Sequence, residues 1–194
     1  MAKPGELRII GGAQRRRRVR IADVEGVRPS PDRVRETLFN WLGQTIDGWC
    51  VLDLFAGSGA LGFEAASRGA AKVVMVERHP KVLQVLRENR ALLGQSGVDI
   101  RQGDAYAWPA QCRERFDLVL ADPPFADTRV PQLLASLSTC IKPSGMVYLE
   151  TPAAVIPADG WTVYRAGRAG LVHYQLLVPG TTEADPPEEP SRAT

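Results

Sequence analysis

The hydrophobic positions between residues 50 and 150 fall into short runs that alternate with longer amphipathic stretches. The short runs are typical of strands buried on both faces, and the longer stretches have the spacing of helices. Such alternation favours a parallel sheet with helical crossovers. The predicted strands are 50–55, 72–77, 98–101, 116–121 and 146–150, and the predicted helices end near 68, near 93, near 112 and near 140.

The alternation stops after residue 150. Two further hydrophobic stretches, 161–165 and 171–178, leave no room for a helix between them. They are therefore predicted to pair as an antiparallel hairpin. The expected fold is α/β and Rossmann-like, a mostly parallel sheet of seven strands that ends in this hairpin.

A short β-ribbon is predicted near the N-terminus, where residues 7–10 and 16–21 flank two glycines. After it, Ser30 is expected to cap a helix that has Pro31 at its first position. The apolar stripe of this helix places Arg35 away from the packed face.

At 194 residues, with 44% hydrophobic and 24% charged residues, the composition is that of a globular protein of ordinary domain size. No apolar run reaches the roughly 18 residues that a membrane span needs, and no secretion signal is visible. Three cysteines and two histidines lack the spacing of a metal site, so we expect no metal. The protein is expected to be a cytoplasmic monomer.

The net charge is only +2, but basic and acidic residues are unevenly distributed along the chain. The first 20 residues hold seven basic residues and one acid, whereas the last stretch is acidic. We divide the chain into a basic ribbon extension (1–28), a catalytic domain (29–178) and a disordered acidic tail (179–194). The basic end is where a polyanion would dock.

The segment Gly57-Ser-Gly-Ala-Leu-Gly62 has the G-x-G-x-x-G spacing of a dinucleotide-binding turn, which by itself is weak evidence. Asp53 precedes it on the strand, and a carboxylate there would repel a pyrophosphate but attract an ammonium or sulfonium group. Glu77 closes the next strand, where an acid can accept the ribose hydroxyls, and Asp104 could meet an adenine amine. These features predict S-adenosylmethionine rather than NAD. The predicted cofactor residues are Asp53, Phe55, Gly57, Gly59, Glu77, Arg78, Asp104 and Ala105.

The fourth strand ends in Asp122, Pro123, Pro124 and Phe125, which form a rigid turn at the edge of the cofactor crevice. The Asp122 carboxylate and the Pro123 carbonyl can accept both hydrogens of an exocyclic amine, and Phe125 offers a face on which a base can stack. These four residues are the predicted catalytic set, because N-methylation requires the amine lone pair to be aimed at the methyl donor.

On these segments the chain resembles the RsmD family of bacterial small-subunit ribosomal RNA guanine-N2 methyltransferases. The matching stretches are residues 8–12, 28–29, 32–42, 52–62, 77 and 122–125. The resemblance implies a class I methyltransferase fold and methylation of a guanine 2-amino group. It also implies that the target is ribosomal RNA within a small subunit or its assembly intermediate.

The arginines of the N-terminal region are predicted to hold RNA phosphates while the base is extruded into the pocket. This set is Arg15, Arg16, Arg17, Arg18, Arg20, Arg33 and Arg35. Two alternatives stay open. A DNA adenine-N6 methyltransferase could use the same amine-binding turn, and an RNA-binding assembly factor could keep the fold without turnover.

Overall fold

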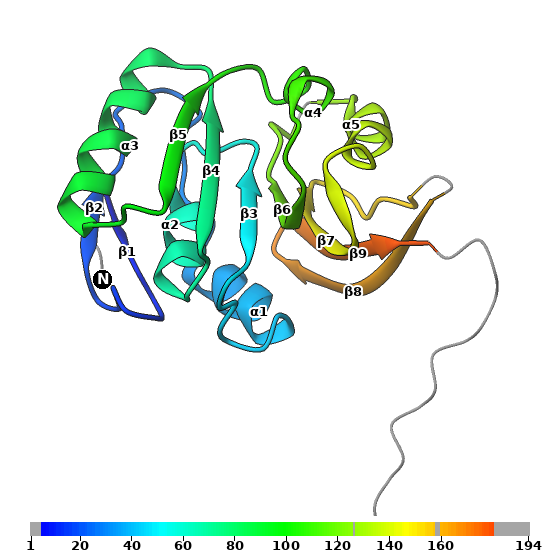
Figure 1. Ribbon diagram of the computed structural model, residues 1–194, viewed down its shortest axis with the longest axis horizontal. Coiled ribbons are helices and arrows are strands. Elements are labelled where there is room, and N and C mark those ends of the chain that lie inside the picture. The colour runs from blue at the N-terminus through cyan, green and yellow to red at the C-terminus, as the bar shows by residue number, and fades with distance from the viewer. Residues whose placement is uncertain (1–4, 126, 158–159, 181–194) are drawn as a thin grey trace, which may run out of the picture.

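The main sheet has seven strands in the order β5-β4-β3-β6-β7-β9-β8, in a computed structural model that describes residues 5–125, 127–157 and 160–180. The first five in this order are parallel, and β9 is antiparallel to both of its neighbours (Figure 1). The strands are β3 (Cys50–Asp53), β4 (Lys72–Glu77), β5 (Val98–Gln102), β6 (Phe116–Ala121), β7 (Ile141–Thr151), β8 (Trp161–Ala169) and β9 (Val172–Pro179). Chain order reverses between β3 and β6, and ligands of such sheets bind beyond the strand ends at that point.

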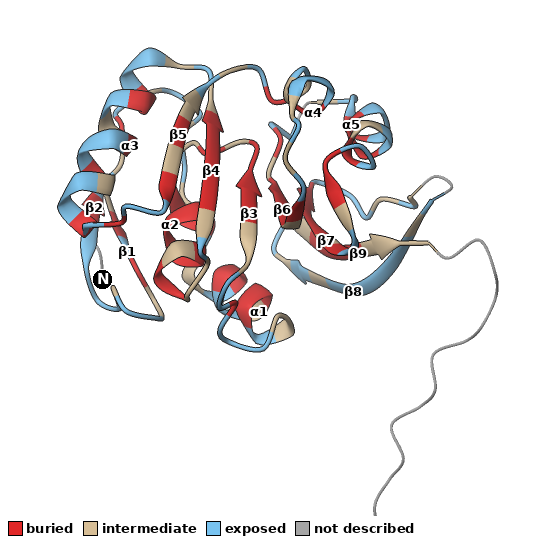
Figure 2. Ribbon diagram, viewed as in Figure 1, coloured by how far each residue is buried: buried red, intermediate tan, exposed pale blue. Residues whose placement is uncertain are grey.

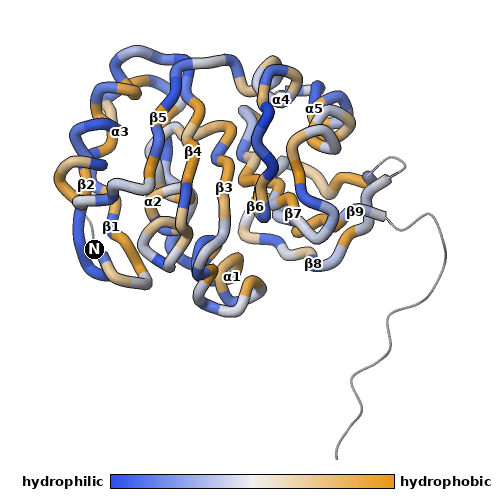
Figure 3. Tube along the Cα trace, viewed as in Figure 1, coloured by the Kyte–Doolittle hydropathy of each residue, from blue (hydrophilic) through white to orange (hydrophobic). Residues whose placement is uncertain are grey.

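Helices cover both faces of this sheet. The helices are α1 (Asp32–Trp41), α2 (Ala60–Ser67), α3 (Pro80–Leu93), α4 (Trp108–Gln111) and α5 (Val130–Leu137). Successive strand residues point to opposite faces, so Val51 packs with α1, α2 and α3, whereas Leu52 packs with α5. The inner strands are therefore buried on both sides (Figure 2), and the positions along β3 and β4 are mainly hydrophobic (Figure 3).

The predicted alternation of strands and helices is confirmed, as is the C-terminal antiparallel hairpin. The largest differences lie around β7. This strand begins at Ile141, five residues before the predicted start, because Ile141 already pairs with Phe116 ahead of a register irregularity. The helix before it is shorter than predicted and ends at Leu137.

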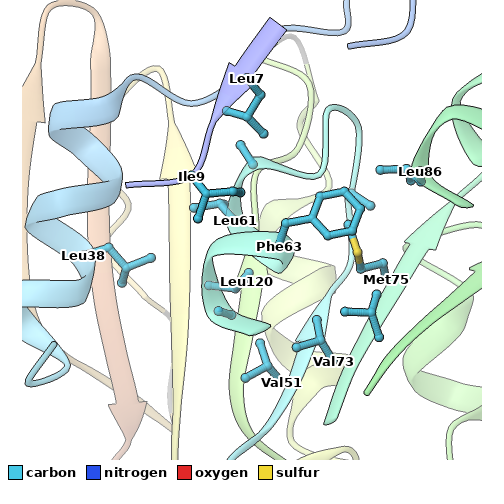
Figure 4. Packing of buried hydrophobic residues seen from close by; sticks show 14 of the residues in the cluster. Leu7, Ile9, Leu38, Val51, Leu61, Phe63, Val73, Met75, Leu86 and Leu120 are labelled. Atoms are coloured by element: carbon cyan, nitrogen blue, oxygen red, sulfur yellow. The ribbon is translucent and has the colours of Figure 1, made fainter. Parts of the chain in front are cut away.

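The N-terminal ribbon consists of β1 (Glu6–Arg8) and β2 (Arg18–Arg20), paired antiparallel. Its apolar residues are part of the main core: Leu7 and Ile9 lie in one buried cluster with Leu61 and Phe63 of α2 (Figure 4). Asn89 of α3 also accepts from and donates to the backbone of Arg20. The ribbon is thus fixed to the α2–α3 layer.

The turn of the ribbon lies against the C-terminal end of α2. The Ala13 amide donates to the Ser67 carbonyl (2.7 Å), and the Gln14 amide donates to the Ser67 hydroxyl (2.9 Å). A side chain at Gly12 would overlap the Ser67 carbonyl, and Gly12 also has a φ of 71°. Gly12 therefore lets the ribbon turn approach α2 closely enough to cap the Ser67 carbonyl at its C-terminal end.

The predicted capping role of Ser30 is wrong. Helix α1 begins at Asp32 with Pro31 as its N-cap residue, and no side chain caps it. Ser30 is buried, and its hydroxyl lies near the carboxylate of Glu150 on β7, whose pKa it lowers. The predicted tail begins with Pro179, which closes β9, and the remainder from residue 181 onward lies outside the described residues.

Candidate active site

The loop between β3 and α2 requires its glycines for steric reasons. Gly57 and Gly59 have φ values of 46° and 80°, a region that glycine adopts without strain. A side chain on Gly59 would overlap the ring of Phe63, and a Cβ on Gly62 would lie 2.9 Å from Oδ2 of Asp53. The loop can therefore bring its backbone close to a ligand at the carboxyl end of β3.

Asp53 ends β3 beneath the first turn of α2. Its side chain is 2% exposed, and its Oδ2 accepts a hydrogen bond from the Gly62 amide (3.0 Å). Burial raises the pKa of this carboxyl to about 7, although the backbone amides of Gly62 and Phe55 act in the opposite direction. Among the described residues no Lys or Arg forms an ion pair with it. The environment of Asp53 therefore fits a positively charged ligand group.

Glu77 ends β4 and holds the glycine loop. Its Oε2 accepts from the Gly57 amide (3.0 Å), and its Oε1 accepts from the amides of Arg78 and His79 (2.8 Å each). Each carboxylate oxygen can accept more than one hydrogen bond, so capacity for a ligand hydroxyl remains. The Arg78 side chain is exposed.

Asp104 follows β5 and caps the turn that leads into α4. Its Oδ1 accepts from the amides of Tyr106 (2.9 Å) and Ala107 (3.1 Å). Ala105 is buried in the core on the α5 side of the sheet. Asp104 therefore has a structural role in the structure as described, and binding of an adenine amine by its second oxygen stays a prediction.

The Asp122-to-Phe125 turn lies at the end of β6, beside β3. Asp122 is half-buried, Pro123 is buried and Phe125 is 50% exposed. One pocket contains both Asp53 and Asp122, which brings the predicted cofactor loop and the predicted amine-binding turn together. The pocket is lined by Arg28, Ser30, Asp53, Phe55, Ala56, Gly57, Ser58, Ala60, Leu61 and Asp122. The predicted residues Gly59, Glu77, Arg78, Asp104 and Ala105 lie outside this lining.

Glu150 belongs to the same end of the sheet and was missed by the sequence reasoning. The register pairs Ala121 with Leu149 on parallel strands, so Asp122 and Glu150 follow as neighbours. Burial raises the pKa of both carboxyls, and repulsion from Glu150 raises the pKa of Asp122 further. An acid closing a buried strand, as Asp53 and Glu77 do, was the available signal.

A second missed group joins the loop after β5 to the loop after β6. Arg129 pairs with Asp127 (2.6 Å), and its guanidinium lies 3.8 Å above the ring of Tyr106. Tyr106 in turn contacts Phe55 edge-on, with ring centroids 5.5 Å apart. These contacts place Arg129 and Asp127 beside Tyr106, which in turn contacts Phe55 of the pocket lining.

The basic run of the ribbon lies far from this pocket. Arg15 and Arg16 are exposed at the ribbon turn, and Arg17 donates to the Leu92 carbonyl near the end of α3. Arg18 pairs with Glu6 and Arg20 with Glu88 on the surface, and Arg33 is exposed on α1. Because the turn caps the far end of α2, it is separated from the glycine loop by about 12 Å of helix, at 1.5 Å for each of its eight residues.

Arg35 does not belong to the exposed set, and its predicted contact with RNA is wrong. Its side chain is 0% exposed on the packed face of α1. The guanidinium donates to Glu64 (3.2 Å), to Asp32 (2.6 Å) and to the Arg8 carbonyl (3.0 Å). The apolar stripe of α1 did not predict the burial of Arg35. A buried arginine needs a partner carboxylate, and only the fold brings Glu64 to it.

Comparison with known proteins agrees with this arrangement. Residues 7–178 match the model of a protein family described as Conserved hypothetical protein 95. Two relatives, each 38% identical, are both called Ribosomal RNA small subunit methyltransferase D. The match to the Haemophilus influenzae relative covers 89% of this chain and 93% of that protein, and the match to the Escherichia coli relative covers 93% and 96%. The chain belongs to this family, the RsmD family.

The RsmD-family assignment extends to the three-dimensional structure. The solved structure of the Escherichia coli protein yhhF is 36% identical, with a TM-score of 0.82 over 90% of this chain and 98% of that one. The fold is the Rossmann-like class I methyltransferase fold, and the cofactor is S-adenosylmethionine. Within the described ranges, no helix has the length and apolar character to cross a membrane, and no cluster of three or more potential metal ligands occurs.

Proposed function

We propose that this protein transfers the methyl group of S-adenosylmethionine to the exocyclic N2 of a guanine in small-subunit ribosomal RNA, in the cytoplasm and as a monomer. The observation that carries the proposal is the single pocket that joins Asp53 to Asp122 at the D-P-P-F turn, in a chain of the RsmD family. The names of the two relatives at 38% identity support the RNA substrate.

The pocket fits the cofactor by charge. Asp53 is a buried carboxylate without a basic partner among the residues described, so it is suited to an ammonium or sulfonium group. Arg28 lines the same pocket and can bind a carboxylate, which the methionine part of the cofactor carries. When bound, S-adenosylmethionine supplies an electrophilic methyl group on a sulfonium.

The chain's own residues then orient the acceptor. Asp122 and the Pro123 carbonyl accept the two hydrogens of the guanine amine, which aims the nitrogen lone pair along the line of displacement. Phe125, half exposed beside them, stacks on the base. The rigid proline turn contributes because a small misplacement of either acceptor would lower the fraction of reactive geometries.

The exposed arginines serve RNA binding by contacts to phosphates. The proposed set is now Arg15, Arg16, Arg17, Arg18, Arg20 and Arg33, without the buried Arg35. Since the ribbon turn is about one helix length from the pocket, an RNA that contacts both must extend across the α2 layer. Such an extended contact is expected to be salt-sensitive and to carry little base specificity.

The test is to incubate the protein with labelled S-adenosylmethionine and three acceptors in parallel. These are unmethylated small-subunit particles, naked small-subunit ribosomal RNA and duplex DNA. Recovery of labelled N2-methylguanosine from either RNA sample supports the proposal. Label in N6-methyladenine of DNA, or no label in any acceptor despite measurable cofactor binding, contradicts it in favour of one of the two alternative functions.

A further inference from the structure

We propose that Glu150 is a positioning residue for methyl transfer, which acts through Asp122 and makes the Asp122 carboxylate the acceptor of the proton that the target amine loses. The proposal rests on the proposed function and deepens it. It assigns a role to a buried acid outside the pocket lining.

The first observation is the position of Glu150 in the sheet. Strands β6 and β7 are parallel and neighbouring, and their register ends with Ala121 opposite Leu149. Neighbouring strands are about 4.8 Å apart, so the next residues, Asp122 and Glu150, are adjacent. Glu150 follows Tyr148 by two positions within β7 and therefore points to the same α1 side of the sheet. Asp122 lines one pocket with Arg28 and Ser30 of the segment before α1, so it lies on that side too.

The second observation is that Glu150 is held in place. Its side chain is 3% exposed, and its Oε1 accepts a hydrogen bond from the Tyr148 hydroxyl (3.0 Å). The Ser30 hydroxyl lies near this carboxylate and lowers its pKa, and Ser30 lines the same pocket as Asp122. Two hydroxyl donors stabilise the ionised form of a carboxylate. The pKa of Glu150 is still raised by burial, and these hydroxyls oppose that effect and so favour a negative charge beside Asp122.

The charged and titratable groups around Asp122 come from every element packed against it. They are Asp53 on β3, Tyr148 and Glu150 on β7, and Arg28 in the segment before α1. Burial raises the pKa of Asp122, and the charges of Glu150 and then Asp53 raise it further. A carboxylate with a raised pKa is a stronger base, and Glu150 is the neighbour that contributes most to this effect.

The chemical step balances with this assignment. A bond forms between the guanine N2 and the methyl carbon, and the bond between that carbon and sulfur breaks with its electron pair left on sulfur. The nitrogen, now positively charged, loses one proton, which passes to an oxygen of Asp122. Glu150 does not touch the substrate in this scheme. It sets the proton affinity of Asp122 and so favours the last transfer.

The experiment compares Glu150→Gln and Tyr148→Phe with wild type, and uses Glu114→Gln as the control. Tyr148→Phe preserves a fully buried ring and removes one donor that keeps Glu150 ionised. It tests the same coupling if Glu150→Gln fails to fold. Glu114 lies before β6, at the opposite end of the sheet, where its partners are Lys72 and Arg101.

The first readout uses the protein without cofactor, by titrating ¹³C-labelled side-chain carboxyls in NMR spectra. The Asp122 midpoint is expected to move to lower pH in Glu150→Gln, less so in Tyr148→Phe, and not in Glu114→Gln. An unchanged midpoint in a folded Glu150→Gln, or in Tyr148→Phe if the former does not fold, overturns the inference. This readout does not depend on the RNA substrate, so it fails or succeeds separately from the proposed function.

The second readout is the single-turnover rate of methyl transfer to RNA as a function of pH. At alkaline pH the rate in Glu150→Gln is expected to fall about tenfold, because the base is weaker. The ratio of variant to wild-type rate should rise as the pH is lowered. A constant ratio at every pH would indicate a purely structural role for Glu150 and overturn the inference. Absence of transfer by the wild type would instead contradict the proposed function.

Discussion

The two ends of helix α2 bury carboxylates in opposite ways. At the C-terminal half, Glu64 is 0% exposed and accepts four hydrogen bonds, from the amides of Ile10 and Gly11 (2.8 and 2.7 Å) and from Arg35 and Arg68 (3.2 and 2.8 Å). At the N-terminal end, Asp53 accepts from backbone amides and has no ion-pair partner among the described residues. Among the described residues, Glu64 thus has basic partners from the chain itself, whereas Asp53 has none.

This difference indicates that the Glu64 end of α2 stabilises the fold, whereas the Asp53 end is suited to binding a ligand. The Glu64 cluster joins the ribbon, α1 and α2, and its charges are matched by its own arginines. The acids at the other end, Asp53, Asp122 and Glu150, lie at the ends of three neighbouring strands, and burial raises the pKa of each. Repulsion from Glu150 raises the pKa of Asp53 and Asp122 further, and repulsion from Asp53 adds to that of Asp122. A group that binds there and carries positive charge relieves this repulsion. The uncompensated end of α2 is therefore the end at which the proposed cationic ligand would be stabilised.

Removing the negative charge of Glu64 should have the largest effect on the free energy of unfolding. Glu64→Gln leaves Arg35 and Arg68 buried without a charged partner, and is expected to lower the free energy of unfolding by about 3–5 kcal/mol. Urea denaturation measures this change. In the control, Glu88→Gln removes an exposed pair with Arg20 and should cost below about 1 kcal/mol. Equal losses in the two variants would show that the buried cluster is not the main tie between the ribbon and α2.

Removing an acid at the other end, where charges are not compensated, should lower the rate of methyl transfer instead. Asp122→Ala removes an acceptor of the amine, and is expected to lower the rate of methyl transfer about a thousandfold. Cofactor affinity, measured by calorimetry, should stay nearly unchanged. Asp117→Ala is the control, since Asp117 lies at the other end of β6 and pairs with Lys142. A large loss of cofactor binding in Asp122→Ala would move this residue from the base subsite to the cofactor subsite.

The pH dependence of stability should distinguish the two ends further. The pKa of Asp53 is about 7 in the folded protein and near 3.8 as a free side chain, so the folded state binds the proton more tightly. Its contribution is fully present below about pH 4 and is lost as the pH rises through 7, with a slope of at most about 1.4 kcal/mol per pH unit. Without cofactor, stability should therefore fall from pH 5 to 8, and Asp53→Asn should flatten this fall. Parallel profiles from urea denaturation would contradict the assignment.

The smallest expected effect concerns the arginines at the ribbon turn. Arg15→Gln should weaken RNA binding and reduce the slope of log affinity against log salt by about 1, if this side chain contacts one phosphate. Arg113→Gln, an exposed arginine beyond α4, is the matched control and should leave the slope unchanged. A fluorescence titration at several salt concentrations measures both. Identical slopes would remove the ribbon turn from the proposed RNA interface.

Much of the site was predictable because it is built from local sequence. Asp53 ends a strand that the hydrophobic pattern reveals, and the glycine loop and the turn of residues 122–125 each follow such a strand. Parallel strands bring their carboxyl ends to one edge, so residues that close these strands meet without further information. Asp104 shows the limit of this reasoning, since its position after a strand was correct while its carboxylate caps a local turn.

The sequence by itself determined the alternating strands and helices, the glycine loop after β3 and the acids at the strand ends. Only the tertiary structure decided which charged side chains are free and which are matched. It buried Arg35 against Glu64, which is 29 residues away, and placed Ser30 near Glu150 instead of at the predicted helix cap. The physical reason is that burying a charge is costly without a partner, and partners distant in sequence are brought together only by packing.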